Sequence, residues 1–455
     1  MNGNVSANLA AVSRTAPAAG GPPAARAGTP RLPVSPLAAG ATIPLAFIAT
    51  GFAAGAIGTA WLALAPAMLA LPHVHPQVVA LAHVWLLGCL LTICCGAIYQ
   101  LLPVLANVPF AGRRQAWTHL ALHAAGVALM VPAFASARMG LVAAGGMLVA
   151  AGVVLLSVAV ARVLRATTRL DPILLAFGAA TAWLLVTVAV GVLLAANLHF
   201  GWFGVDVLAV LRAHAHLGVG GFFVTLLQGA LFRLVPMFTL GELRGTRRVG
   251  VALAASQLGL LVLVPALGLG RTRGVLAGAA LLAGSFVLTA FELRRVWATR
   301  RKRALEPGLR GFFLGLGALG LAALLGTALT ATEGNVRAAL AYGVLAVIGG
   351  VLAAVEGMLC KIVPFLVWMR VYGPRVGRQP TPAAAALGSP RCERAWVVLH
   401  AAGALLLAAG AAAGETRLLA AGAWALAAGQ ISLGASLAQV ARHLWRPMIL
   451  TKANP

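Results

Sequence analysis

Long apolar stretches alternate with short polar segments along this 455-residue chain. A helix needs about 20 consecutive apolar residues to cross the hydrocarbon core of a bilayer. Twelve stretches meet this requirement, so the sequence predicts an all-α, polytopic membrane protein. The predicted transmembrane helices are approximately residues 40–70, 77–106, 116–136, 139–163, 172–199, 205–238, 248–269, 274–297, 309–331, 336–370, 394–413 and 416–441.

A motif recurs in each third of the chain, on predicted helices 2, 6 and 10. Its first copy, with the spacing H-x4-G-x3-T-x3-G-x6-P, consists of His83, Gly88, Thr92, Gly96 and Pro103. The second copy starts at His216 and keeps every residue, whereas the third starts at Val344 and has lost the histidine and the threonine. Recurrence at a nearly constant separation predicts an internal repeat. The twelve helices then form three pseudo-threefold repeats of four, at about 39–170, 171–305 and 306–445.

Composition agrees with a membrane protein, and the charge distribution predicts its orientation. Hydrophobic residues make up 61% of the chain and charged residues 9%, which excludes a water-soluble surface around the whole molecule. If the N-terminus is cytoplasmic, 26 of the 34 lysines and arginines lie in inside segments and five in outside loops. This asymmetry follows the positive-inside rule. It explains the net charge of +25 without a nucleic-acid partner, and it predicts a multi-pass protein of a bacterial-type inner (plasma) membrane with both termini cytoplasmic.

Two terminal segments flank the predicted membrane domain, which spans 39–445. Residues 1–38 are rich in Ala, Pro and Gly and contain neither an acidic residue nor an apolar run of signal-peptide length. They are predicted to form a disordered cytoplasmic tail. Residues 446–455 are predicted to form a second, shorter cytoplasmic tail.

Histidines near the outer ends of helices 2 and 6 are the candidate ligands for a cofactor or a metal. These residues are His83, His214 and His216. An unpartnered imidazole is costly in hydrocarbon, so each ring needs either a ligand or a hydrogen bond to a neighbouring helix. The repeat places His83 and His216 equivalently, which favours a ligand for them. For His73, His75 and His199, which flank the same outer surface, hydrogen bonds to carbonyl groups or interfacial water are favoured.

The two histidines of helix 6 are predicted to face different neighbours. Two residues on an α-helix are separated by about 200°, so the rings of His214 and His216 leave opposite faces. Glycines lie 5 and 13 residues after each motif start. They allow close approach either of another helix or of a flat ligand.

Other polar side chains inside the predicted helices have mainly structural interpretations. His123 and His400 each lie in a Leu-His-Ala-Ala-Gly sequence, and structural hydrogen bonds are favoured for both. Glu356 is the one acid set well inside a predicted span. Two roles remain open for it, an ion pair with Lys361 or an adjacent basic end, and the carrying of a proton.

The segment from Ala213-His214-Ala215-His216 through Gly221 and Gly229 to Pro236 resembles subunit I of the haem–copper oxidase superfamily, most closely its cbb-type and nitric-oxide-reductase branch. Twelve helices in three arcs of four are also similar to that family. The resemblance implies that one histidine of the H-x-H pair binds a low-spin haem and the other binds the haem of the active site. It also implies that a histidine on helix 2 supplies the second ligand of the low-spin haem. The residues that match are His216, His214 and His83.

The departures from the family pattern are equally specific. The family carries H-x-H on its tenth helix, whereas here the motif lies on the sixth, and helix 7 has no adjacent histidine pair. The resemblance therefore implies a divergent member that binds haem b, with copper as a further candidate, but without a complete haem–copper reaction centre or assignable catalytic residues. Electron transfer, gas sensing and support of a respiratory complex are the roles implied, with other respiratory membrane subunits or a cytochrome as partners. Any enzymatic activity would be that of a haem-dependent oxidoreductase related to oxygen or nitric oxide reductases.

Two functions of other classes stay open. The outer histidines could pass a soft cation inward in a membrane transporter or copper permease, although transporters more often have two related halves or inverted repeats. Alternatively, the protein binds no cofactor and its repeat serves packing alone. An absorption spectrum of the purified protein separates the haem hypothesis from both.

Overall fold

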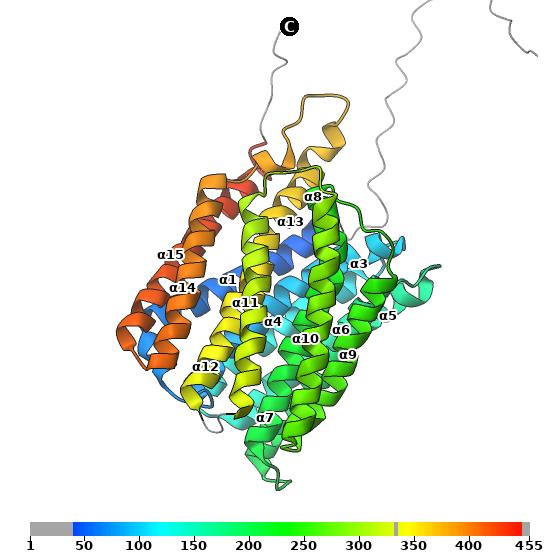
Figure 1. Ribbon diagram of the computed structural model, residues 1–455. Coiled ribbons are helices and arrows are strands. Elements are labelled where there is room, and N and C mark those ends of the chain that lie inside the picture. Colours follow the sequence, from blue (N-terminus) through cyan, green and yellow to red (C-terminus); the bar gives the residue numbers. More distant parts are fainter. Residues whose placement is uncertain (1–39, 332–334, 448–455) are drawn as a thin grey trace, which may run out of the picture. The chain divides into compact units, whose positions relative to one another are not determined.

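The computed structural model describes residues 40–331 and 335–447 (Figure 1). These residues contain 12 helical spans that are long and apolar enough to cross a membrane. The predicted all-helical membrane fold is therefore confirmed. The predicted N-terminal tail, 1–38, and most of the predicted C-terminal tail, 446–455, lie outside the described residues.

Nine of these twelve spans are single α-helices. They are α1 (Thr42–Leu64), α4 (Arg113–Ala135), α5 (Met139–Ala166), α6 (Pro172–Phe200), α9 (Arg247–Gly268), α10 (Thr272–Ala298), α11 (Pro307–Ala328), α14 (Pro390–Ala413) and α15 (Thr416–Arg442). Their bounds agree with the sequence except in the first span, which was expected to continue to residue 70. Helix α1 ends at Leu64, and the 3₁₀ turn η1 (Pro66–Ala70) follows, because a proline cannot donate the backbone hydrogen bond that continues a helix.

Spans 2, 6 and 10 each consist of a π-helical segment between two α-helices. Span 2 consists of α2 (Pro76–His83), η2 (Val84–Leu91) and α3 (Thr92–Ala106). Span 6 consists of α7 (Val207–His216), η3 (Leu217–Val224) and α8 (Thr225–Thr239). Span 10 consists of α12 (Val336–Val344), η5 (Leu345–Leu352) and α13 (Ala353–Val371). The three π segments start at the same offset from the motif, directly after its first residue.

The same kinds of helix pair recur along the chain. Helices α1, α6 and α11 each pack on the π segment and the inner α-helix of the span that follows them. The hairpins α4–α5, α9–α10 and α14–α15 are packed along their lengths, and Figure 1 shows α14 lying beside α15. Each third of the chain therefore uses the same neighbours.

Each of these hairpins also crosses at a pair of glycines. An ideal Cβ atom on Gly126, Gly259 or Gly403 would lie 2.6, 3.1 or 2.9 Å from the carbonyl oxygen of the facing glycine. The facing residues are Gly145, Gly278 and Gly422. Only a residue without a side chain permits backbones to approach this closely. These recurring contacts support the threefold repeat, while the superposition of the three units remains a prediction.

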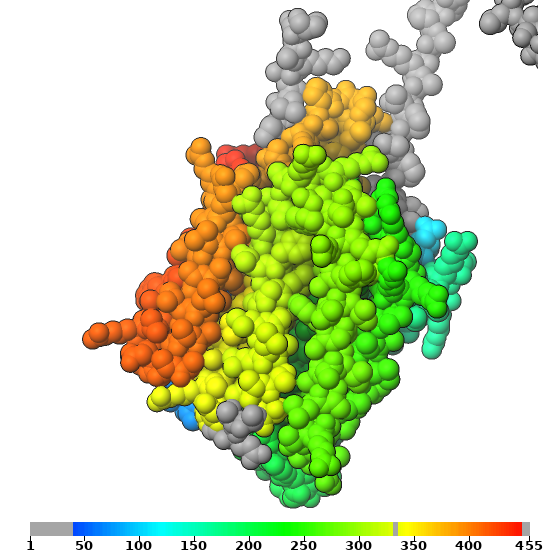
Figure 2. Space-filling view, in the orientation of Figure 1, coloured from blue at the N-terminus to red at the C-terminus, as the bar shows by residue number. Residues whose placement is uncertain are grey.

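Spans 2, 6 and 10 form the interior of the helical bundle. In their most apolar windows 72%, 67% and 72% of residues are buried, against at most 50% in the other spans. The outer helices expose large apolar side chains, and Figure 2 shows the face formed by α10, α11 and α14. On these three helices Val287, Leu324 and Leu405 are each more than half exposed. Such a surface suits lipid rather than water.

Candidate functional site

The backbone around each motif is shaped by its π segment. A π-helix bonds each N–H to the carbonyl five residues earlier and widens the helix locally, and such segments are frequent at functional sites. Thr92 Oγ1 donates to the Leu87 carbonyl at 3.0 Å, and Thr225 Oγ1 donates to the Gly220 carbonyl at 3.3 Å. Each threonine thus bonds the carbonyl five residues before it. This contact explains why the motif keeps a threonine at that position in two copies.

His83 is held by the turn that precedes it. Its Nδ1 lies 2.7 Å from the Val79 carbonyl oxygen, so Nδ1 carries the hydrogen and donates it. The ring lies against Phe134, with ring centroids 4.5 Å apart. In the neutral ring Nε2 then carries the lone pair, which is the form that binds metals.

His216 is held in the same way but has a second partner. Its Nδ1 donates to the Arg212 carbonyl oxygen at 2.8 Å, and its Nε2 accepts from the Tyr342 hydroxyl at 3.1 Å. Tyr342 belongs to α12, so this contact joins spans 6 and 10. The lone pair of His216 is therefore used within the protein.

His214 leaves the opposite side of α7, as the spacing predicted. Its ring lies against α6, where an ideal Cβ atom on Gly191 would be 2.8 Å from its Cε1. The ring has a hydrogen bond with the Thr187 backbone, and its Nδ1 is a buried atom without a geometrically satisfactory partner among the described residues. His214 also lies within electrostatic range of His83. Of the sequence-predicted ligands, His83 and His214 are thus within electrostatic range of each other, whereas His216 contacts Tyr342 of span 10.

The π segments of spans 6 and 10 contact each other, as do those of spans 2 and 10. His83, His214 and His216 are all partly exposed. Two imidazoles on facing spans, one with a free lone pair and one with an unpartnered nitrogen, fit the axial ligands of a haem.

A complete copper centre finds no counterpart in the part of the chain that the structure describes. Within residues 40–331 and 335–447, no three His, Cys, Asp or Glu side chains are grouped so that they could hold a metal ion. The candidate site is therefore a pair of ligands rather than a cluster.

The glycines of the motif serve helix packing. Ideal Cβ atoms on Gly96, Gly229 and Gly357 would lie 2.5 to 2.6 Å from atoms of α1, α6 and α11, respectively. Gly88, Gly221 and Gly349 also face side chains of neighbouring helices. Of the two interpretations open for these glycines, the close approach of another helix is the one the structure shows.

The outer histidines that flank the site have local roles. His75 caps α2, where its Nδ1 accepts from the Gln77 N–H at 3.3 Å, and His199 packs on Phe200 with ring centroids 4.6 Å apart. Burial and the nearby Arg212 guanidinium lower the pKa of His73. The neutral form of the His73 ring is therefore favoured.

Tyr342 is a site residue that the sequence had not singled out. It precedes the motif start Val344 by two residues, as His214 precedes His216, and Leu81 precedes His83 by the same offset. The position two residues before each motif start therefore holds Leu, His and Tyr in the three copies. Comparison of the three copies at this offset would have revealed a polar residue in two of them.

Comparisons with known proteins bear on the fold. No family model matches the chain, and no curated protein matches it. Among solved structures, the chain is similar to a haem–copper terminal oxidase that was determined as a dimer, with 12% sequence identity and a TM-score of 0.63. The match covers 92% of this chain and 84% of that chain. The protein therefore has the fold of a haem–copper terminal oxidase chain.

Proposed function

We propose that the protein is a divergent member of the haem–copper oxidase superfamily that binds one b-type haem between spans 2 and 6. His83 and His214 would be its axial ligands. The proposal is supported by two imidazoles that lie within electrostatic range of each other on spans 2 and 6. Nδ1 of His83 bonds the Val79 carbonyl, which leaves its Nε2 lone pair for a ligand, and Nδ1 of His214 has no partner among the described residues. A haem with two imidazole ligands supplies reversible one-electron transfer.

Neighbouring residues determine the tautomer of His83 and the position of the His214 ring. The Val79 carbonyl fixes the tautomer of His83 and raises the basicity of Nε2, as hydrogen bonds to metal-ligating histidines generally do. Gly191 leaves room for the His214 ring beside α6. Tyr342 occupies Nε2 of His216, so we assign no haem to that histidine, in contrast to the resemblance, which implies one haem for each member of the pair.

The proposed role is electron transfer in a respiratory membrane, with other membrane subunits or a cytochrome as partner. The H-x-H motif alone supports the cbb-type and nitric-oxide-reductase branch. The alternating basic loops support an inner-membrane location with both termini cytoplasmic, which places the site in the outer half of the bilayer. We assign neither dioxygen nor nitric oxide reduction, because the copper ligands of that chemistry are not found among the described residues.

An absorption spectrum of protein produced with ample haem tests the proposal. We expect a low-spin spectrum with sharp reduced bands, because both axial positions are filled and water is excluded. His83→Ala and His214→Ala should each weaken this spectrum or convert it to a high-spin form. His216→Ala should retain it, as should the control His199→Ala, because neither side chain is assigned as a ligand.

Two results would contradict the proposal in different ways. Loss of the low-spin bands in His216→Ala with retention in His214→Ala would show that the other member of the pair is the ligand. A wild-type protein without a Soret band would exclude haem. Copper retained under those conditions, and lost on replacing His214 and His216, would instead support the copper permease.

A further inference from the structure

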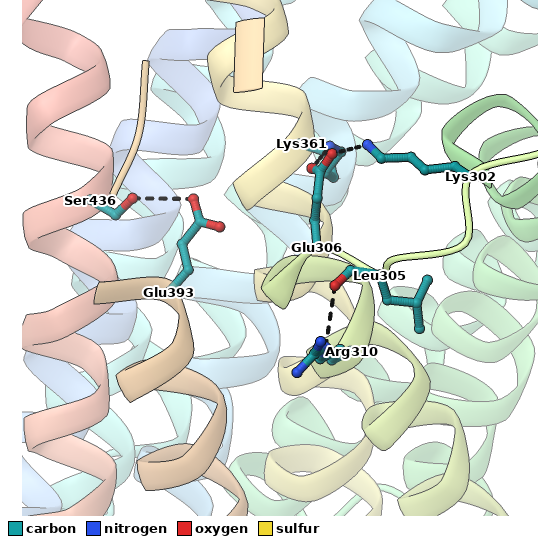
Figure 3. A network of polar contacts seen from close by, with 7 residues as sticks. All are labelled: Lys302, Leu305, Glu306, Arg310, Lys361, Glu393 and Ser436. Atoms are coloured by element: carbon teal, nitrogen blue, oxygen red, sulfur yellow. Dashed lines mark hydrogen bonds and ion pairs between the residues drawn. The ribbon is translucent and has the colours of Figure 1, made fainter. Parts of the chain in front are cut away.

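Glu356 is a fully buried acid in α13, and its partners differ from those expected. Its side chain is 0% exposed, and its Oε2 accepts from Trp396 Nε1 at 2.9 Å and lies 3.2 Å from His400 Nδ1. The alternative of an ion pair between Glu356 and Lys361 is wrong. Lys361 instead pairs with Glu306, which also binds Lys302 (Figure 3).

The contact between Glu356 and His400 requires a proton. His400 Nε2 lies 2.9 Å from the carbonyl oxygen of Ile348 in η5. A carbonyl only accepts, so Nε2 carries a hydrogen, and in the neutral ring Nδ1 would present a lone pair. An ionised carboxylate also presents only lone pairs, so the 3.2 Å contact is attractive only if one proton lies between Nδ1 and Oε2.

We propose that Glu356 and His400 form a proton-binding site inside the membrane domain, and that this site exchanges its proton with water at the cytoplasmic face. The proposal does not depend on haem. It takes up the second role that the sequence left open for Glu356 and assigns the partner that shares the proton.

A second, independent observation indicates that the site accommodates a small polar ligand. Oε1 of Glu356 and Nε2 of Gln430, both more than nine-tenths buried, have no hydrogen-bond partner in the described part of the chain. Cys360 and Leu433 pack together with Trp396. Glu356 precedes Cys360, and Gln430 precedes Leu433, by about one turn, so the two unpartnered groups lie at one level on α13 and α15. An acceptor and a donor left free in this way fit an internal water, which can relay a proton.

Polar groups continue from this level towards the inner end of the bundle. Cys360 Sγ lies 3.7 Å from the Glu356 carbonyl oxygen, and Glu393, seven residues before His400 on α14, lies about 10 Å further inward. Glu393 Oε1 accepts from Ser436 Oγ at 3.3 Å (Figure 3). The other titratable or charged groups near this path are Cys89 of η2, Lys302 and Glu306 before α11, Arg310 in the first turn of α11, and Lys361 of α13.

Glu356 can be compared with the equivalent residues of the other two repeats. The residue 12 positions after the motif start is Cys95 in the first copy, Gln228 in the second and Glu356 in the third. His123, the counterpart of His400, makes the same bond from Nε2 to the Leu87 carbonyl at 3.0 Å, but its Nδ1 finds no partner within the described residues. The first copy thus has the imidazole without the shared proton. The glutamine of the second copy shows that this side chain fits the position.

Infrared difference spectroscopy of the full-length protein in lipid nanodiscs tests the proposal. Haem-free preparations are suitable, so failure here is distinguishable from failure of the haem proposal. Between alkaline and acid buffer we expect a carboxylic-acid C=O band that shifts in D₂O. Glu356→Gln should lose this band, whereas the control Glu415→Gln, at an exposed position before α15, should retain it.

Two further variants keep the test decisive. Glu393→Gln should keep the band but slow its exchange in D₂O, and unchanged exchange would overturn the cytoplasmic route. If Glu356→Gln fails to fold, His400→Gln should shift the frequency of the band, because it removes the shared proton. A band that persists unchanged in Glu356→Gln, or in His400→Gln, would overturn the proton-binding site.

Discussion

At the scale of single residues, hydrogen bonding distinguishes histidines that the sequence presents as similar. His83 and His216 occupy equivalent positions and both donate from Nδ1 to the carbonyl four residues earlier. They differ because Tyr342 binds Nε2 of His216 and nothing comparable is described for His83. The equivalence inferred from the repeat therefore holds for the backbone and for one ring nitrogen, but not for the other.

The bond between Tyr342 and His216 yields a prediction about stability. Tyr342→Phe and His216→Ala should be non-additive in a double-mutant cycle, with a coupling energy of about 0.6 kcal/mol, the average for side-chain hydrogen bonds in membrane proteins. Unfolding in mixed micelles with increasing denaturing detergent measures it. Additive effects would show that the bond contributes nothing to stability. The pair Tyr342→Phe and His199→Ala, whose members do not share a hydrogen bond in the structure, is the control and should be additive.

At the scale of secondary-structure elements, the residues of the motif contribute to the π segment and to its packing against a neighbouring span. The threonine bonds the carbonyl five residues back, and the glycine that follows it lets spans 1, 5 and 9 approach. In the third copy Ala353 replaces the threonine, and the corresponding carbonyl keeps the bond from His400, as the first copy's carbonyl has one from His123. The motif therefore reflects local backbone geometry in addition to any ligand, and this is why it survives in a copy without histidine.

Glycine crossings between hairpin helices give a prediction at the same scale. In Gly403→Ala the new methyl group would meet Gly422 O and Leu426 N, each at 2.9 Å, so α14 and α15 must separate. We expect a loss of roughly 1–3 kcal/mol in the free energy of unfolding, as for other overpacked sites. Detergent-induced unfolding followed by circular dichroism measures it.

Gly284 provides the matched control, because an ideal Cβ atom there meets no described atom within 4 Å. Gly284→Ala in α10 should leave stability unchanged or raise it by up to about 1 kcal/mol, since alanine favours a helix over glycine. Equal effects of the two substitutions would show that the crossing is not tightly packed.

At the scale of the whole molecule, the helical bundle places three π-containing spans in the interior and lipid-facing helices around them. This arrangement has the fold of a haem–copper terminal oxidase at 12% sequence identity. In this chain the H-x-H pair lies on span 6. His216 of that pair contacts Tyr342 of span 10, and the proposed haem lies between spans 2 and 6.

The orientation in the membrane gives the prediction that belongs to this scale. Ser136 lies in the loop between spans 3 and 4, and Arg244 in the loop between spans 6 and 7, and both are exposed. In intact spheroplasts a membrane-impermeant thiol reagent should label Ser136→Cys, whereas Arg244→Cys should react only after permeabilisation, because basic loops stay inside. The reverse pattern would place both termini outside. Wild-type protein, whose cysteines are buried or half-buried, reports the background labelling.

The sequence by itself determined the class of fold and the approximate bounds of the twelve spans. The length of an apolar stretch decides whether a helix can cross the bilayer, and the distribution of Lys and Arg between loops predicts its orientation, and both are local properties of the sequence. The motif also marked spans 2, 6 and 10 as related and, from the sequence alone, made His83, His214 and His216 the candidate ligands. Only the tertiary structure decided that Tyr342 binds Nε2 of His216, that His83 and His214 are within electrostatic range of each other, and that Glu356 contacts His400 rather than Lys361. These pairings join residues up to 131 positions apart on different spans, and helical periodicity specifies the face of a side chain but not the neighbour that it meets.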